Sequence, residues 1–363
     1  MSTAVPAGTR PEADPLGRAR RRRRNTGILA ALAAALFGAA VLGVAVGPVW
    51  VPPGEVLQVI AARLGAGPTA GLDPVADAIV WDVRLPRVVM GLSVGAGLAV
   101  CGMALQAMVR NMLADPYLLG INSGASSGAA ATILFGLGLG LGEHALAGSA
   151  FLGALAASLL VFVVARAAGR ITSVRLLLAG VAVGYALSAL TSFLIFASGS
   201  AEGARSVMFW LLGSLSLSRW GTPLAALGAV VVLTVVLLTA WARRLDALAV
   251  GDETALALGV RPTRFRTQLL VVVSLCVGFI VAASGSIGFV GLVVPHLARR
   301  LAGAAHAWAV PAAALLGALF LLAADLLSRM VMQPRELPIG IVTALVGAPF
   351  LLYLVRRLRP AAA

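Results

Sequence analysis

The sequence contains no lysine, and its 28 basic residues are all arginines. A phosphate-binding loop of the GxxxxGK[ST] type requires a lysine, so this chain cannot hold a nucleotide through that motif. If ATP drives its activity, we expect another protein to bind the ATP.

Charged residues are scarce. They make up 12% of the 363 residues, and hydrophobic residues make up 60%, whereas soluble domains are about 25% charged. Repeated apolar runs near 20 residues match a hydrocarbon core of about 30 Å at about 1.5 Å per helical residue. The sequence therefore predicts an all-α polytopic membrane protein. The net charge of +14 could also suit nucleic-acid binding, but the arginines lie in short loops between apolar runs, as topology determinants do.

Cysteine and histidine are rare as well. Cys101 and Cys276 both lie within apolar runs and are expected to be small buried packing residues. His144, His296 and His306 are scattered and lack the spacing of metal ligands. We therefore predict no metal site. No cluster of titratable residues is expected at a common depth, so we also predict no catalytic residue and expect that the chain is not an enzyme. No cofactor is expected to bind to it.

The two termini are expected to be cytoplasmic tails. Residues 1–26 are rich in arginine, proline and alanine and lack apolar periodicity, which predicts a disordered basic tail, and 357–363 form a short tail at the other end. A cleaved signal peptide is the alternative for the N-terminus. However, the apolar run 27–47 is long enough to span, and Val44-Ala45-Val46 is a poor cleavage site.

Residues 27–356 are expected to form one transmembrane domain of about ten helices. A short interfacial helix is predicted within 54–65, a polar loop at 242–266, and a short, broken helix pair around 284–288. The expected spans are 27–47, 86–108, 118–141, 146–165, 176–197, 222–241, 269–283, 290–297, 308–328 and 338–355. With the N-terminus inside, 21 of the arginines fall on the inner side and seven outside, which favours both termini inside.

Four motifs occur in order along this domain. They are RLPR (84–87), RNMLADPYLLGINSGA (110–125), GFVGLVVPHLAR (288–299) and ADLLSR…ELPIGIVTALVGAPFLLYL (324–354). Together they resemble the FecCD family of ABC permeases over roughly residues 50–356. One departure is Met112, which stands where the family usually has the first proline of Arg-Asn-Pro-Leu-Ala-Asp-Pro. Its effect on that turn is left open.

The resemblance implies the membrane subunit of a type II ABC importer in the bacterial plasma membrane. Two copies, or this chain and a paralogous partner, would form the path. Two cytoplasmic ATPases using ATP and Mg²⁺ would drive it, and an extracytoplasmic binding protein would deliver the substrate. The expected cargo is an iron chelate, first a ferric siderophore, with haem and cobalamin as alternatives. A secondary, ion-coupled transporter is the alternative of another class, disfavoured by the absence of paired buried charges in the predicted helices.

The resemblance assigns binding-protein docking to Arg84, Arg87 and Arg329 at the outer helix ends. Arginine suits that role because its planar fork can hold a carboxylate through two hydrogen bonds. The alternative is that these side chains only anchor helix ends at the membrane surface. Asp325 is expected to pair with Arg329 one helical turn later rather than to relay protons.

The segment 250–260, VGDETALALGV, predicts a short helix in the inner loop, with acidic residues at its N-terminus. The resemblance makes it the helix that couples the permease to the ATPase; a solvated loop helix is the alternative. The expected contacts are Asp252, Glu253, Leu256, Leu258 and Gly259.

Small residues are concentrated in the runs 86–108, 118–141 and 176–197. They permit close helix packing, and some could instead line a wide path, for which 176–197 is the preferred helix. The path and gate candidates are Arg110, Asn111, Ser123, Gly124, Gly184 and Ser188.

Overall fold

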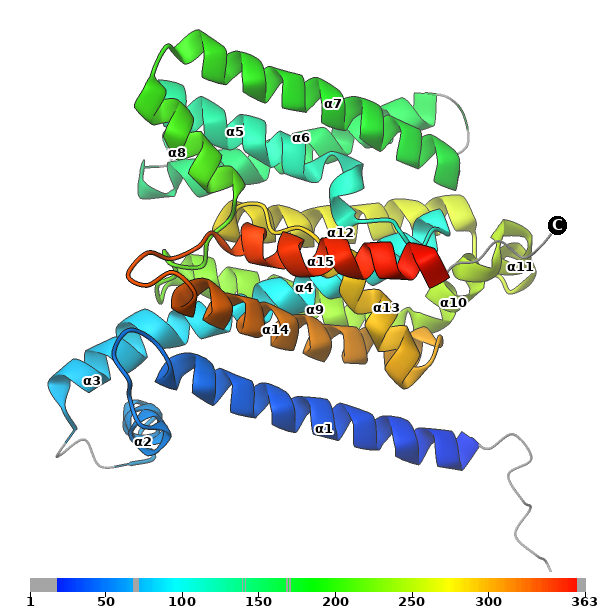
Figure 1. The fold of residues 1–363 in the computed structure, drawn as a ribbon. Helices are drawn as coiled ribbons and strands as arrows, with labels where there is room; N and C mark the ends of the chain where they lie inside the picture. Colours follow the sequence, from blue (N-terminus) through cyan, green and yellow to red (C-terminus); the bar gives the residue numbers. More distant parts are fainter. Residues whose placement is uncertain are drawn as a thin grey trace, which may run out of the picture.

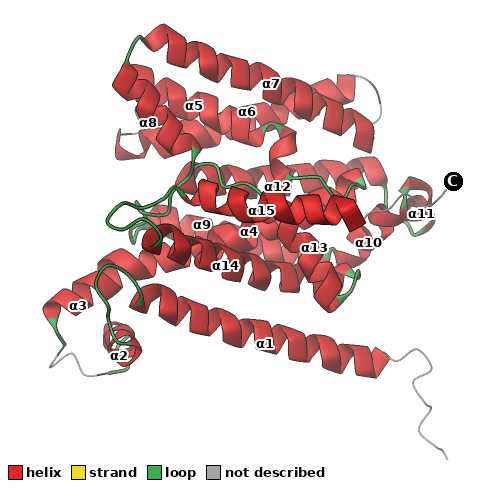
Figure 2. Ribbon diagram, viewed as in Figure 1, coloured by secondary structure: helices red, strands yellow, loops and turns green. Residues whose placement is uncertain are grey.

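A computed structural model describes residues 18–67, 72–138, 140, 142–167, 169 and 171–357. Every regular element in these ranges is helical (Figure 2). The long helices run side by side, from α1 at one edge of the molecule to α7 at the opposite edge (Figure 1).

The N-terminal half of the described chain contains α1 to α7. Its elements are α1 (Arg18–Ala45), α2 (Pro53–Arg63), α3 (Pro74–Ala78), the π-helix η1 (Ile79–Arg84), α4 (Leu85–Val109), the 3-10 helix η2 (Pro116–Leu119), α5 (Ile121–Phe135), the 3-10 helix η3 (Gly142–His144), α6 (Ala145–Ala167) and α7 (Ser173–Ser198). The remaining elements are α8 (Ala201–Leu211), α9 (Thr222–Ala240), α10 (Ala242–Val250), α11 (Asp252–Ala257), α12 (Pro262–Ser284), α13 (Val290–Ala302), α14 (His306–Met330) and α15 (Ile339–Arg357).

Helix α4 is the central element of the bundle. It packs against α9, α12, α13 and α14, and 19 of its 25 residues are buried. Glycine makes these contacts close: a Cβ on Gly95 would lie 2.2 Å from the Gly317 carbonyl oxygen, and one on Gly102 would lie 1.9 Å from that of Gly291. Small residues let helix backbones approach closely in a membrane, where dispersion contacts drive helix association.

A second group of helices is formed by α5, α6 and α7. Here Gly124 on α5 and Gly153 on α6 face each other, and a Cβ on either would lie within 2.3 Å of the other's carbonyl oxygen. Helix α7 packs on α5 and α6 and leaves a long apolar face exposed.

Seven of the described helices are long and apolar enough to cross a membrane, and residues Ile339–Tyr353 of α15 form a shorter apolar helix. The expected count of ten is therefore not reached by length alone. In the described residues of the run 118–141, the helical elements are the end of the 3-10 helix η2 and the 15-residue α5, because Gly120 adopts φ +70° between them and Gly136 ends α5 at φ +66°.

Two helix starts differ from expectation. The predicted 269–283 span is the 23-residue α12, which begins at Pro262, because proline at the first helical position is preorganised for a helix. Helix α1 begins at Arg18, so residues 18–26 are helical and the expected disorder is wrong for them; arginine is a good helix former. Asn25 is buried and donates to the Ala302 carbonyl (2.9 Å). Residues 1–17 and 358–363 lie outside the described chain.

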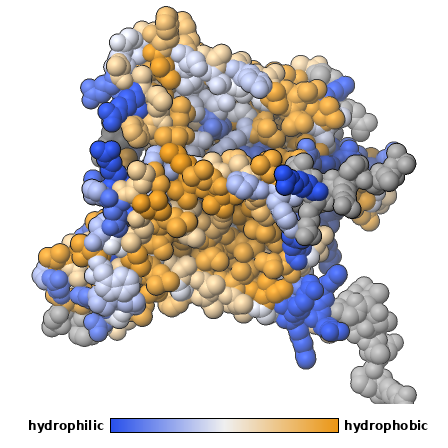
Figure 3. Space-filling view, viewed as in Figure 1, coloured by the Kyte–Doolittle hydropathy of each residue, from blue (hydrophilic) through white to orange (hydrophobic). Residues whose placement is uncertain are grey.

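The two ends of the bundle differ in composition. The N-terminal end of α1, the helices α10 and α11, and the C-terminal end of α15 share one end, whereas α2, α3 and α8 lie at the other (Figure 1). A broad apolar band separates polar patches at the two ends (Figure 3). This arrangement agrees with a bundle that crosses a membrane, with the arginine-rich end inside.

Candidate functional site

A cluster of four charged side chains joins α4, α14 and the α14–α15 connection at the outer end. Arg87 Nε donates to Asp325 Oδ1 (2.8 Å), and Arg87 Nη1 donates to the Glu336 carboxylate (2.9 and 3.0 Å). Arg329 Nε lies 3.1 Å from Asp325 Oδ2 in an ion pair. The predicted pairing of Asp325 with Arg329 is therefore confirmed, and Arg87 is a second partner that the sequence did not reveal.

Arg84 is buried beside this cluster. Its Nη1 donates to the carbonyls of Val44 (2.8 Å) and Ala45 (3.0 Å), and its Nη2 donates to that of Val49. The last carbonyls of a helix lack partners within the helix and carry the negative end of its dipole. Arg84 thus neutralises and holds the C-terminal end of α1.

Arg329 has a similar role on the same helix end. It is buried, and it donates to the carbonyls of Gly43 (2.9 Å) and Val46 (3.1 Å). In this conformation Arg84 and Arg329 direct their guanidinium groups inward, and Arg87 is also mostly covered. The exposed member of the cluster is Glu336, whose side chain is 45% exposed. Docking by the three arginines stays a prediction, and it would require movement of at least two of them.

A hollow of about 790 Å³ opens next to this cluster. Its floor includes the break after α12, where Ser214 N donates to the Ser284 carbonyl (2.8 Å) and Gly285 adopts φ +68° against the Trp210 carbonyl. The predicted helix interruption at 284–288 therefore forms part of the lining of this hollow. The polar and aromatic lining residues are Arg87, Ser206, Phe209, Trp210, Ser214, Ser216, Ser284, Ser328 and Glu336.

At the inner end, the predicted coupling segment forms α11 and its flanks. Asp252 accepts from Arg266 Nη1 (2.9 Å) and Nη2 (2.7 Å). Arg266 is almost fully buried and also donates to Ser173 Oγ (3.1 Å) and to the Met108 carbonyl (3.3 Å). Asp252 thus links α11 to the ends of α4, α7 and α12. Its side chain is still 39% exposed, and its contact with the ATPase stays a prediction.

The other coupling residues lie at the surface. Leu256 and Leu258 are 50% and 67% exposed, and Glu253 is exposed as well. Gly259 adopts φ +78° just after the helix, a conformation that suits glycine as a helix terminator. This part of the segment therefore presents an exposed surface with two leucines, and contact of these residues with the ATPase stays a prediction.

A second contact at the inner end holds α10, and little in the sequence points to it. Asp246 on α10 accepts from the His306 backbone N–H (3.0 Å), and its Oδ1 lies 2.6 Å from His306 Nδ1. His306 is buried at the first position of α14. The histidine that seemed isolated in sequence thus joins α10 to α14.

The path and gate candidates do not form one site. Arg110 ends α4 with φ 55° and is exposed, and Asn111 Oδ1 accepts from Leu113 N (2.9 Å) at the inner end. Ser123 and Gly184 are neighbours across α5 and α7, since a Cβ on Gly184 would lie 3.8 Å from Ser123 Oγ.

Gly124 is buried in the α5–α6 contact and Ser188 is exposed on α7. Met112, in the turn after α4, is 54% exposed. Gly124 therefore packs helices in this conformation, and Ser123, Gly184 and Ser188 remain the candidates on α5 and α7.

The same turn contains Asp115, which precedes η2. Its carboxylate accepts from the Tyr117 backbone N–H (2.9 Å), the arrangement expected of an N-terminal helix cap. Desolvation raises the pKa of Asp115 to about 6, although this hydrogen bond acts in the opposite direction.

Residues 33–357 match the model of the FecCD transport family. The chain belongs to this family. It is 45% identical over 286 residues to the cobalamin import system permease protein BtuC of Halobacterium salinarum, covering 79% of this chain and 75% of that protein. It is 41% identical over 283 residues to the hemin transport system permease protein HmuU of Yersinia pestis, covering 77% and 84%.

A solved structure described as an inward-facing conformation of a putative metal-chelate type ABC transporter superposes with a TM-score of 0.80. It is 34% identical and covers 92% of this chain and 100% of that one. This FecCD protein is the permease subunit of a type II ABC importer and a multi-pass plasma-membrane protein. It is not an enzyme, because ATP hydrolysis belongs to a separate ATPase.

Proposed function

We propose that this FecCD permease imports a bulky iron chelate, with a ferric siderophore as the first candidate. The observation that carries the proposal is the outer hollow of about 790 Å³. Serine hydroxyls, two aromatic rings and the Arg87–Glu336 pair line it. Such groups suit the organic periphery of a chelate, since hydroxyls can both donate and accept hydrogen bonds and aromatic rings contact its apolar parts.

The path itself is proposed to form between this chain and a second copy or a paralogous partner. Two exposed faces support this. Helix α7 exposes Tyr185, Phe193 and Phe196, and an apolar groove of about 540 Å³ runs along α15. Large exposed apolar surfaces mark contacts with lipid or protein. Ser123, Gly184 and Ser188 lie on or beside α7 and are the proposed path residues.

The remaining partners are proposed from the two ends. An extracytoplasmic binding protein would dock at the outer end, where Glu336 is the exposed member of the charge cluster. Two ATPases, which use ATP and Mg²⁺, would bind at the inner end and contact Leu256 and Leu258. This chain itself is proposed to bind no cofactor.

The test is uptake into proteoliposomes that contain the permease, its ATPase and its binding protein. Ferric siderophore, haem and cobalamin are supplied in labelled form, because the two relatives described above are named for cobalamin and hemin. We expect ATP-dependent uptake of the ferric siderophore. Preferred uptake of haem or cobalamin would reassign the cargo, and uptake driven by an ion gradient without ATP would refute the importer mechanism.

A further inference from the structure

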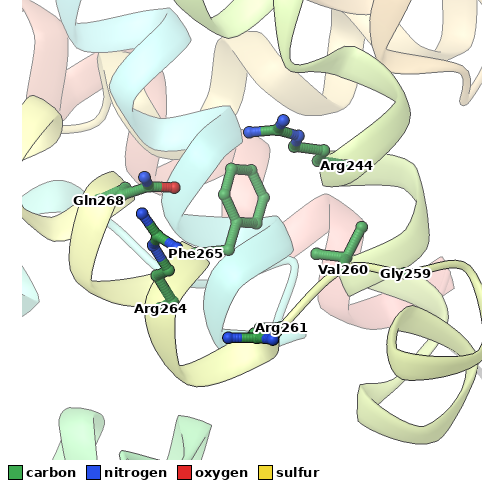
Figure 4. Close-up of a pocket in the computed structure, with 7 residues that line it drawn as sticks. All are labelled: Arg244, Gly259, Val260, Arg261, Arg264, Phe265 and Gln268. Carbon is green, nitrogen blue, oxygen red and sulfur yellow. The ribbon is translucent and has the colours of Figure 1, made fainter.

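An arginine-lined pocket lies beside the coupling segment at the inner end (Figure 4). Its volume is about 320 Å³, at the small end of the range for small-molecule sites. Residues from α10, from the turn after α11 and from α12 line it. They are Arg244, Gly259, Val260, Arg261, Arg264, Phe265 and Gln268.

The positive charge of this pocket is not balanced from within. None of the lining residues is acidic. Within the described chain, the side chains of Arg244, Arg261 and Arg264 form no hydrogen bond or ion pair, whereas Arg266 on the same helix is held by Asp252. Arg244 lies on one side of the Phe265 ring and Arg264 and Gln268 on the other (Figure 4). An anion between them would relieve the repulsion of like charges and accept charge-assisted hydrogen bonds.

The depth of the pocket in the membrane indicates which class of anion it would bind. Arg261 immediately precedes α12, Arg264 lies on its first turn, and Arg244 follows the end of α9 by one turn. Because α9 and α12 are membrane-spanning helices, these side chains lie at the level of the phospholipid headgroups. The cytoplasmic leaflet, where an arginine-rich end is expected, is the anionic one.

The surface below the pocket is apolar. Along α12, the residues Arg264, Gln268, Val271 and Leu275 follow one another at helical spacing, and Val271 and Leu275 are 53% and 39% exposed. A headgroup phosphate in the pocket would therefore be continuous with a face that acyl chains can cover. A carboxylate from a cytoplasmic protein would leave that apolar face uncovered.

We propose that Arg244, Arg261 and Arg264 bind the headgroup phosphate of an anionic phospholipid. Gly259 and Val260, which end the coupling segment, form part of the same pocket. The bound lipid thus bridges α10 and α12 and steadies the segment that contacts the ATPase.

The test compares lipid binding to the full-length permease by native mass spectrometry, with phosphatidylglycerol and phosphatidylcholine as probes. The variant is Arg244→Gln/Arg264→Gln. The matched control is Arg243→Gln/Arg300→Gln, which removes two exposed arginines of the same end that lie outside the pocket. We expect the variant to lose about fivefold in phosphatidylglycerol affinity per arginine, and the control to retain the wild-type affinity.

Because Arg244 and Arg264 are exposed, their removal should leave the fold intact. The wild-type chain provides an independent test, because its preference between the two lipids is measured without any substitution. Equal binding of both lipids to the wild type would overturn the proposal. Unchanged lipid binding in the variant would also overturn the proposal. If the binding of the variant to the ATPase fell at the same time, the pocket would be assigned to a contact with the ATPase. Competition by inorganic phosphate as strong as by phosphatidylglycerol would assign it to a free anion.

Discussion

Replacement of Asp325 tests the charge cluster at the outer end. Its side chain is 2% exposed and is shared between Arg87 (2.8 Å) and Arg329 (3.1 Å). Removing one partner of a buried ion pair typically costs about 3–5 kcal/mol, because the remaining charge stays buried. Arg329 keeps its bonds to the α1 carbonyls and Arg87 keeps its bonds to Glu336, so both arginines retain part of their neutralisation. Asp325→Ala should therefore destabilise the protein by about 3 kcal/mol, the lower end of that range.

Glu336 provides the matched comparison on the same arginine. It also bonds Arg87 (2.9 Å), but its side chain is 45% exposed, and exposed ion pairs contribute about 1 kcal/mol or less. Thermal unfolding of the detergent-purified variants should therefore show a large fall for Asp325→Ala and a small one for Glu336→Gln. Equal falls for the two variants would refute the argument that burial sets the strength of these contacts.

Three further predictions concern other regions. Asp252→Asn removes the charge that Arg266 pairs with, so ATP hydrolysis should continue while chelate uptake in proteoliposomes falls; unchanged uptake per ATP would contradict it. Gly124→Ala should lower thermal stability by about 1–3 kcal/mol through overpacking, whereas Gly184→Ala, with its nearest neighbour at 3.8 Å, should not; similar losses would count against the packing role. Because the folded pKa of Asp115 is raised to about 6, its contribution to stability is present below about pH 4 and is lost as the pH rises through about 6. The stability of Asp115→Asn relative to wild type should therefore increase between pH 4.5 and 7.5 in unfolding measurements, and a constant difference would disprove the assignment.

The membrane class, most helix positions and the Asp325–Arg329 pair could be predicted because each depends on spacing along one helix. Apolar run length fixes a span, and residues four apart meet on one helix face. The exposed Leu256 and Leu258 belong to this group, since a short helix in a polar loop exposes part of its surface.

The partners of Arg84 and Arg266 could not be predicted in this way. Arg84 bonds carbonyls about 40 residues away, and these are available only because α1 ends beside it. Arg266 lies in a sequence that reads as a polar loop, yet it is buried by the ends of three other helices. The role of Gly124 depended in the same way on which helix faces it. Each case is decided by tertiary contact, which residue type and spacing do not specify.

Helix α4 has a mechanical consequence for the importer. Arg87 lies on its first turn and the Met108 carbonyl, which Arg266 and Ser173 both contact, lies on its last. At about 1.5 Å per residue, these ends are some 30 Å apart on one continuous rod. The glycine contacts at Gly95 and Gly102 prevent it from rotating without separating its neighbours. If α11 couples to the ATPase as proposed, a push on α11 would reach the outer surface as a movement of the whole rod together with α13 and α14, without a chain of side-chain rearrangements in between.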